Sequence, residues 1–335
     1  MKRALPLVGL HVLVALPWLP LGPARLYILH VVILILIWSV VGTAWSLMGR
    51  FGLVSLGHGA FLGVGAYTTV LLWNFWGVPP WIGTPLAVAA ACFLALVLGY
   101  PCFRFRVVGH YFALVTLALG EVIRLLIIAE RDWTGGSLGV TLKDAGAGAV
   151  NLVALQFADR RVFYFIALGV WLAGLLVWRW VDRSMTRSAL EAIGEDETAA
   201  ASVGIPVTRF KLKITLLSAT LTAVGGVLYG QYVTYLDPGT LAGIGVSLRI
   251  VFAVVLGGMY TLLGPTVGTA LTIALAEYLR VAFGVRFLGM AETIYGLALI
   301  LIIIFLPAGL YGGLRELWRA RPRPLAAATP PVRPA

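Results

Sequence analysis

The sequence predicts an all-α protein, a polytopic bundle of transmembrane helices with about ten spans. Of its 335 residues, 60% are hydrophobic and only 12% are charged, a composition outside the range of soluble globular proteins. The apolar residues fall in runs of roughly 20, the length that crosses a bilayer as a helix. Basic residues gather in alternate connections between these runs, as the positive-inside rule predicts.

Ten apolar stretches are the candidate spans. They cover residues 4–21, 26–48, 54–76, 81–101, 110–128, 162–181, 211–235, 246–260, 263–284 and 289–308. The first follows Lys2 and Arg3 as in a signal peptide, but another apolar run comes soon after it. We therefore expect a retained span, with a cleaved signal as the alternative. The eighth is short and ends beside Gly257 and Gly258, and the turn after it is compatible with a re-entrant segment.

The distribution of positive charge orients the bundle. With an inner N-terminus, most of the 25 Lys and Arg residues fall in inner connections and in the C-terminal tail. We expect both termini and the connection 179–213 to be cytoplasmic. Residues 1–310 then form one transmembrane domain, with a glycine-rich outer loop at about 129–161 that is suited to cover the mouth of a pathway. Residues 311–335 form a basic, Pro/Ala-rich cytoplasmic tail close to anionic lipid headgroups.

The long cytoplasmic connection contains a predicted helix at about 188–204. Ser188 and Glu191 have the spacing of a capping box at its start. Gly204 can adopt the left-handed conformation that ends a helix, and Pro206 follows it. The residues between these ends form a partial apolar stripe beside several acidic residues. A capped, half-apolar helix outside the bilayer is typical of an element that docks on a partner.

Polar residues in the third and fifth spans are candidates for lining a translocation pathway: Ser55, His58, Tyr67, Thr116, Glu121 and Arg124. Glu121 and Arg124 are three residues apart and share a helix face. A charged side chain at bilayer depth costs about 2.5–3.5 kcal/mol, so we expect this pair to form and to face the bundle interior. Two alternatives stay open: an ion pair that only holds helices together, and a solvated His58 near the inner end.

Other features of the spans indicate packing and anchoring. Gly59 and Gly63 form a G-x-x-x-G pattern, which favours close helix packing. Glu277 beside Arg280 is expected to anchor an outer span end. Arg249 is expected to extend outward along its helix, toward Asp237.

Several functional classes lack support in the sequence. It contains no phosphate-binding loop, no metalloprotease or serine-hydrolase motif and no carboxylates at catalytic spacing. We therefore expect no catalytic residue, cofactor or metal site on this chain, and no enzyme activity of its own. The basic residues lie in membrane connections rather than in an aromatic-rich soluble patch, so the expected partner is the lipid bilayer and not nucleic acid.

Several ordered motifs resemble one family. Residues 55–67, 109–121 and 134–139 are similar to the permease subunits of branched-chain amino acid ABC importers, most of all to the M-type permease of the leucine/isoleucine/valine system. The similarity continues through 192–197, 256–265 and 295–310, so it covers nearly the whole chain.

The resemblance implies which residues couple the chain to an ATPase. Importer permeases share a cytoplasmic E-A-A-x-x-x-G motif followed by I-x-L-P. Here Ala199, Ala200, Gly204, Ile214 and Leu216 fit, while Thr198 replaces the glutamate and Leu217 the proline. The implied coupling residues are Glu195, Asp196, Glu197, Ala199, Ala200 and Gly204.

The resemblance also implies an assembly and a substrate. It implies a fold like the larger type II importers in the bacterial inner membrane, with a second permease (a heterodimer), two cytoplasmic ATP-binding subunits and a periplasmic or lipid-anchored substrate-binding protein. Leucine, isoleucine and valine are the implied substrates. Two alternatives remain open: the same importer class carrying urea or short amides, and a proton-coupled secondary transporter.

Overall fold

A computed structural model of the chain describes residues 11, 13–19, 22–146, 150–157, 159–283, 293, 294, 296 and 297. Almost all of this part is helical, as the sequence predicts. Seven helical segments are long and apolar enough to cross a membrane: α2 (Arg25–Gly49), α4 (Pro80–Arg104), α5 (His110–Ala129), α7 (Arg160–Asp182), α10 (Val207–Val233), the α11–α12 segment (Pro238–Gly257) and α13 (Gly264–Phe283).

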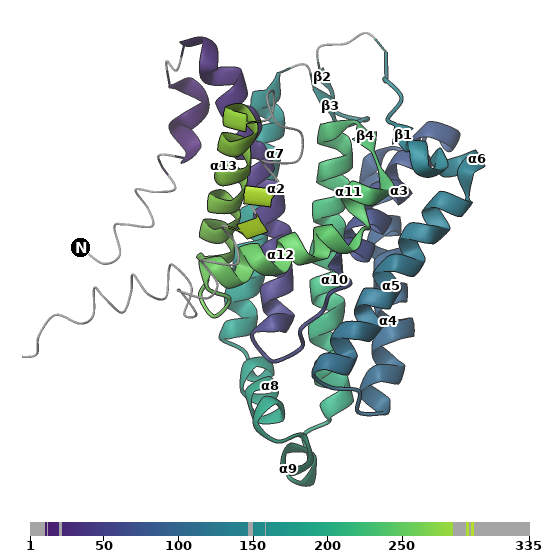
Figure 1. Ribbon diagram of the computed structural model, residues 1–335, viewed down its shortest axis with the longest axis vertical. Helices are drawn as coiled ribbons and strands as arrows, with labels where there is room; N and C mark the ends of the chain where they lie inside the picture. The colour runs from purple at the N-terminus through teal and green to yellow at the C-terminus, as the bar shows by residue number, and fades with distance from the viewer. Residues whose placement is uncertain are drawn as a thin grey trace, which may run out of the picture.

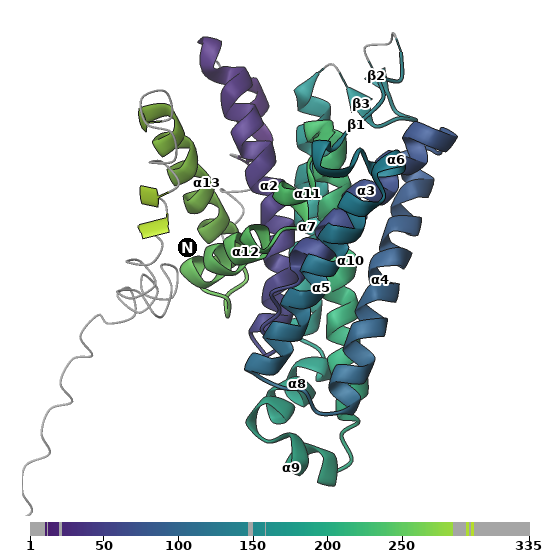
Figure 2. The same cartoon turned by 45° about the vertical axis from the view of Figure 1, so that its right-hand side comes forward.

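The long helices run roughly parallel and alternate in direction (Figures 1 and 2). They correspond to predicted spans two, four to seven and nine, with ends shifted by a few residues. The first predicted span, 4–21, lies mostly outside the described residues and contains the 3₁₀ turn η1 (Leu16–Trp18). A second 3₁₀ turn, η2 (Gly22–Ala24), leads into α2. The last predicted span, 289–308, also lies almost wholly outside the described residues.

Helix α3 (His58–Trp76) occupies the centre of the bundle and is not among the seven apolar helices. It packs against α10, α4, α5 and α12, so its surroundings are protein on most sides. Its contact with α10 is close because Gly65 and Gly226 face backbone, where a Cβ atom would overlap Ala223 and Leu62 respectively. A helix enclosed by protein needs no continuous apolar surface, which explains its small and polar residues.

The sequence left the stretch 246–260 open between a full span and a re-entrant segment. After α11 (Pro238–Leu241), helix α12 (Ile244–Gly257) runs across the bundle at mid-height, and α13 rises from there (Figures 1 and 2). Gly257 and Gly264 meet so closely at the intervening turn that a Cβ atom on either would overlap the backbone opposite it. These glycines let the chain turn back within the bundle, a course that agrees with the re-entrant alternative.

The loop between α5 and α7 lies at the opposite end of the bundle from α8 and α9 (Figure 1). It contains α6 (Arg131–Thr134), the 3₁₀ turn η3 (Gly136–Leu138) and the short strands β1 (Val140–Thr141), β2 (Val150–Asn151) and β3 (Gln156–Phe157). Strand β1 pairs antiparallel with β4 (Tyr235–Leu236), with Val140 opposite Leu236, and β2 pairs with β3. The first pairing ties this loop to the end of α10.

The predicted cytoplasmic helix at 188–204 is two helices in the structure. Helix α8 (Met185–Glu195) begins one turn earlier than predicted, and α9 (Glu197–Ser202) follows after a break at Asp196. The side chain of Asp196 accepts hydrogen bonds from the backbone N–H groups of Thr198 and Ala199, at 2.7 and 3.0 Å. Aspartate is a strong N-cap, so this residue starts a new helix where a continuous one was predicted.

Candidate functional site

The α8–α9 unit forms one end of the molecule and holds its position by contacts with three long helices. Figure 1 shows α9 at the extreme lower end, beyond the ends of α4 and α5. Leu190, Ile193 and Ala200 are buried in a core shared with the lower parts of α2, α4 and α10. These buried residues confirm the predicted apolar stripe, except that Val203 is 77% exposed.

Charged contacts at this end attach α8 to the spans. Arg50, just after α2, contacts Asp182 at the end of α7 at 3.1 Å, and Arg187 of α8 contacts the same carboxylate at 3.2 Å. The Arg50 guanidinium also lies over the ring of Trp178, 4.2 Å from its centroid. Burial lowers the pKa of Arg50 to about 10, against the opposing effect of Asp182. The residue therefore stays charged at neutral pH and joins α2 to α7, while Arg187 joins α8 to the same carboxylate.

The six predicted coupling residues have different surroundings. Ala200 is buried, Glu197 binds Lys211 of α10, and Asp196 caps α9. Glu195, Ala199 and Gly204 are exposed. Gly204 has a φ of +89° just beyond the end of α9, which confirms the predicted left-handed residue. Three of the six residues thus hold the unit together, and three are available to a partner.

A buried polar cluster lies near the start of α3, and we call it the His58 cluster. It contains three predicted pathway residues, Ser55, His58 and Thr116, together with Ser218, which the sequence did not predict. His58 is fully buried, so the solvated alternative is wrong. Its Nε2 lies 2.8 Å from Ser218 Oγ, and its Nδ1 lies 3.2 Å from Ser55 Oγ. Thr116 Oγ1 accepts from the backbone N–H of Leu56 at 2.9 Å.

The hydrogen bonds of the His58 cluster define which ring nitrogen of His58 carries the proton. Ser218 Oγ donates its only proton to the carbonyl of Ala44 at 2.7 Å, so it must accept from His58 Nε2–H. Nδ1 then accepts from the hydroxyl of Ser55. This arrangement suits a neutral imidazole that connects α2, α3 and α10.

The remaining predicted pathway residues lie apart from this cluster. Tyr67 is buried and donates from its hydroxyl to the carbonyl of Leu236 at 3.2 Å. Glu121 and Arg124 form the expected ion pair on α5. Their side chains are 32% and 28% exposed, so the pair lies on the side of the chain and not in its interior as predicted. A role for any of these residues in a pathway stays a prediction.

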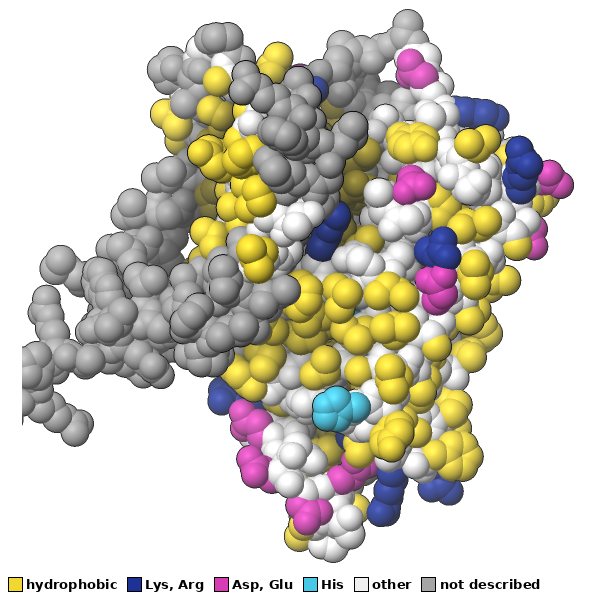
Figure 3. Space-filling model, in the orientation of Figure 1, with side chains coloured by type: hydrophobic (Ala, Val, Ile, Leu, Met, Phe, Trp, Pro, Cys, Tyr) yellow, Lys and Arg dark blue, Asp and Glu magenta, His cyan; other side chains and the backbone are white. Residues whose placement is uncertain are grey.

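The structure contains a pocket that the sequence did not predict. It lies between α2, α10, the α11–α12 segment and α13, and its volume is about 380 Å³. This volume is within the range of about 300–1,000 Å³ typical of small-molecule sites. Figure 3 shows the recess between α13 and the α10–α11 side, with a basic side chain visible inside it.

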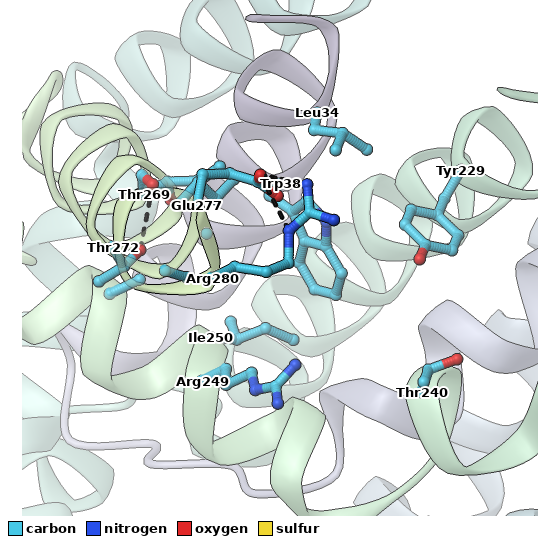
Figure 4. Close-up of a pocket in the computed structure, with 14 residues that line it drawn as sticks. Leu34, Trp38, Tyr229, Thr240, Arg249, Ile250, Thr269, Thr272, Glu277 and Arg280 are labelled. Carbon is cyan, nitrogen blue, oxygen red and sulfur yellow. Dashed lines mark hydrogen bonds and ion pairs between the residues drawn. The ribbon is translucent and has the colours of Figure 1, made fainter. Parts of the chain in front are cut away.

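Ionic side chains occupy one part of this pocket. The Glu277–Arg280 pair forms as expected, with 2.6 Å between Arg280 Nη2 and Glu277 Oε2. Tyr27 also donates to Oε2, at 2.9 Å. No ion pair joins Arg249 to Asp237 among the described residues, and Asp237 caps α11 by accepting from the backbone N–H of Thr240 at 2.9 Å. Figure 4 shows Arg249 extending from α12 into the pocket instead.

Aromatic and aliphatic side chains form the other walls. Trp38 and Tyr229 make an edge-to-face contact with 5.6 Å between ring centroids. Leu34, Ile250 and Ile273 also line the pocket. Four helices that are distant in sequence contribute these residues, so no local motif marks the site. The nearest sequence signal is Arg249 itself, an ionisable residue within an apolar span.

Comparison with known proteins places these features in a family. Residues 27–306 match the family of the branched-chain amino acid transport system permease component. The chain is 30% identical to the high-affinity branched-chain amino acid transport system permease protein LivM of Escherichia coli K12 over 329 residues, which cover 92% of this chain and 75% of that protein. It is 24% identical to the permease protein LivH of the same organism, over 79% of this chain and 87% of LivH.

The LivM protein of Salmonella typhimurium is 29% identical over 82% of this chain and 68% of its own length. No solved structure matches the chain. The family match covers most of the sequence, including α2 to α13, and the α-helical bundle agrees with a multi-pass membrane protein. The chain belongs to the family of permease components of branched-chain amino acid transport systems.

Proposed function

We propose that this chain is the membrane-spanning permease subunit of an ATP-driven importer, and that it moves leucine, isoleucine and valine into the bacterial cell. Family membership supports the transport role, and the names of the similar LivM and LivH proteins support the substrate. Similarity to two kinds of permease protein supports a heterodimer with a second permease. The remaining partners are two cytoplasmic ATP-binding subunits and a periplasmic or lipid-anchored substrate-binding protein.

The α8–α9 unit is the proposed coupling element. The observation that supports this mechanism is its firm attachment to the bundle together with its exposed end. The unit shares a buried core with α2, α4 and α10, makes ionic contacts with α7 and α10, and has an exposed end made largely of small and apolar residues. An element that switches a bundle between two states must be rigid and must make different partner contacts in each state. ATP-driven closure of the ATPase subunits would press on the exposed end of α9.

In the proposed topology the protein lies in the bacterial inner membrane with both termini in the cytoplasm. A re-entrant α11–α12 segment followed by α13 returns the chain to the face it left, as two full spans would. The predicted side of the C-terminus is therefore the same for either arrangement. We propose a type II importer-like fold with crossings at 4–21 and 289–308 in addition to those of α2, α3, α4, α5, α7 and α10. In this topology the 129–161 loop covers the outer face, and the 311–335 tail lies at the inner one.

Uptake of radiolabelled leucine by proteoliposomes tests this function. The full importer, with its second permease, ATPase subunits and binding protein, should accumulate leucine only with ATP and retain this activity when an ionophore removes the proton gradient. Urea and acetamide serve as competitors. Uptake without ATP that stops with the ionophore would instead identify the proton-coupled transporter, and competition by urea or acetamide would identify the amide importer.

A further inference from the structure

We infer that the pocket around Arg249 is a binding site for the zwitterionic headgroup of the transported amino acid. The inference rests on the proposed function and adds the residues that recognise the substrate within the membrane. The Arg249 guanidinium has no carboxylate and no hydrogen-bond acceptor among the described residues, although it lines a pocket in the middle of an apolar segment. Basic residues in other parts of the chain, such as Arg50 and Lys211, have carboxylate partners.

Arg249 is exposed toward the pocket in the described part of the chain, and an unpaired guanidinium within an apolar membrane segment favours an anionic partner. A charged side chain inside a membrane segment is costly, and such residues normally pair or mark a substrate route. The planar guanidinium matches a carboxylate through two parallel hydrogen bonds. Tyr229 faces the same space in Figure 4, and its hydroxyl forms no hydrogen bond to another described residue. Arg249 and Tyr229 therefore both present hydrogen-bond donors to the same pocket.

A complementary negative group lies in the same pocket. Both donors that contact Glu277, the hydroxyl of Tyr27 and the guanidinium of Arg280, reach Oε2. Oε1 has no donor among the described residues. It is available to accept from an ammonium group. The pocket thus offers an unpaired cation for a carboxylate and an unused carboxylate oxygen for an ammonium group.

The apolar walls complete the match to a branched-chain amino acid. Leu34, Trp38, Ile250 and Ile273 form an aliphatic and aromatic lining beside the charged groups, and an alkyl side chain buried there is stabilised by removal of its surface from water. Urea and short amides carry no formal charge, so they would leave Arg249 unpaired. The pocket therefore favours a zwitterion over the neutral substrates.

The ligand itself provides the first test, because it needs no altered protein. Binding of radiolabelled leucine is measured by scintillation proximity on the purified permease pair with its ATPase subunits, in the absence of the binding protein. Leucinamide lacks the carboxylate and 4-methylpentanoate lacks the ammonium group. Each should compete at least about tenfold more weakly than leucine, because a hydrogen-bonded charge pair is lost. Equal competition by leucinamide would overturn the assignment of Arg249.

Substitutions provide the second test. Arg249→Gln should weaken leucine binding at least about tenfold, and Arg249→Lys should retain part of it, because an ammonium group keeps the charge but not the paired geometry. Arg104→Gln, the same change at the far end of α4 and outside the pocket, serves as the control. In uptake assays with the binding protein present, Arg249→Gln should raise KM or lower the maximal rate, whereas Arg104→Gln should not.

The outcomes separate this inference from the proposed function. If wild-type importer accumulates leucine with ATP and Arg249→Gln binds and transports it as well as wild type, the pocket assignment is wrong and the function stands. If wild-type importer moves no leucine, both are wrong. A phosphatidylethanolamine headgroup also combines an anion with an ammonium group. Displacement of that lipid from the pocket, with no leucine binding in lipid-free detergent, would identify a lipid site and overturn the inference.

Discussion

The ammonium group of Lys211 lies 2.6 Å from Glu197 Oε2, and the two side chains are only 5% and 19% exposed. This contact connects the first residue of α9 to the first turns of α10, across the Gly204–Pro206 turn. It is the most direct mechanical link between the proposed coupling helix and a helix that contacts α2, α3 and α4. A force applied to α9 can reach the centre of the bundle through this pair.

Removing one partner of this ion pair should destabilise α9. Lys211→Met leaves Glu197 largely buried and unpaired. The free energy of unfolding should fall by an amount toward the lower end of about 3–5 kcal/mol. Hydrogen exchange of the α9 amides in the full importer should accelerate, and leucine uptake should fall. The double variant Lys211→Met with Glu197→Gln should recover part of the protection, because no uncompensated charge remains. A double variant that exchanges as fast as Lys211→Met would contradict the ion-pair account.

The left-handed glycine at the end of α9 provides a second prediction. Gly204→Val forces a β-branched residue to a φ of +89°, a conformation that costs non-glycine residues about 1–2 kcal/mol or more. Uptake should fall while ATP hydrolysis continues. Gly194→Ala is the matched control, because Gly194 is helical and the nearest atom to its added Cβ is 3.9 Å away. Equal transport by Gly204→Val and Gly194→Ala would remove the turn from the coupling mechanism.

Asp196 predicts a pH dependence that is confined to α9. Hydrogen bonds from Ala199 N–H and Thr198 N–H lower the pKa of this carboxyl group. A lowered folded pKa contributes stability above the unfolded value of about 3.9, and this stability is lost as the pH falls through the folded pKa. Hydrogen exchange of α9, corrected for its intrinsic pH dependence, should therefore accelerate as the pH falls below about 4. Asp196→Asn keeps a cap but cannot titrate, so its corrected exchange should accelerate less than that of wild type over the same pH range.

The His58 cluster predicts a structural role. Ser218→Ala leaves the buried Nε2–H of His58 without an acceptor, which should lower the free energy of unfolding by about 1–3 kcal/mol. Thermal unfolding of the purified complex should occur at a lower temperature than for Thr220→Val, whose hydroxyl donates to Leu216 O within its own helix. ATP-driven uptake by surviving protein should keep the wild-type dependence on pH. A pH profile displaced by Ser218→Ala would indicate that His58 titrates during transport.

The sequence predicts the features that depend on local pattern. Apolar runs locate the long helices, and the spacing of Glu121 and Arg124 predicts their ion pair. Gly204 predicts the end of the coupling segment. The predicted start of that segment is wrong. Ser188 and Glu191 have the spacing of a capping box but lie inside α8, where Glu191 binds Arg187 at 2.7 Å. Asp196 was assigned to the interior of a helix although its residue type favours a cap.

The features that depend on tertiary contacts were not predictable. Hydropathy measures length and polarity, so it could not distinguish a full span at 246–260 from a helix lying across the bundle. A solvated His58 stayed open as an alternative because nothing local indicates its buried contact with Ser218, 160 residues away. The sequence predicts that Arg249 extends toward Asp237, whereas in the structure it lines a pocket whose walls come from helices distant in sequence.

Coupling through the exposed end of α9 is tested most directly by the ratio of leucine transported to ATP hydrolysed in proteoliposomes containing the full importer. Val203 is 77% exposed there, and Val203→Asp should leave the fold intact but weaken docking on the ATPase subunits. Ala87→Asp, a buried site in α4, controls for general misfolding through its lower yield of assembled protein. The account predicts a sharply reduced transport ratio for assembled Val203→Asp. A ratio equal to that of wild type would contradict it.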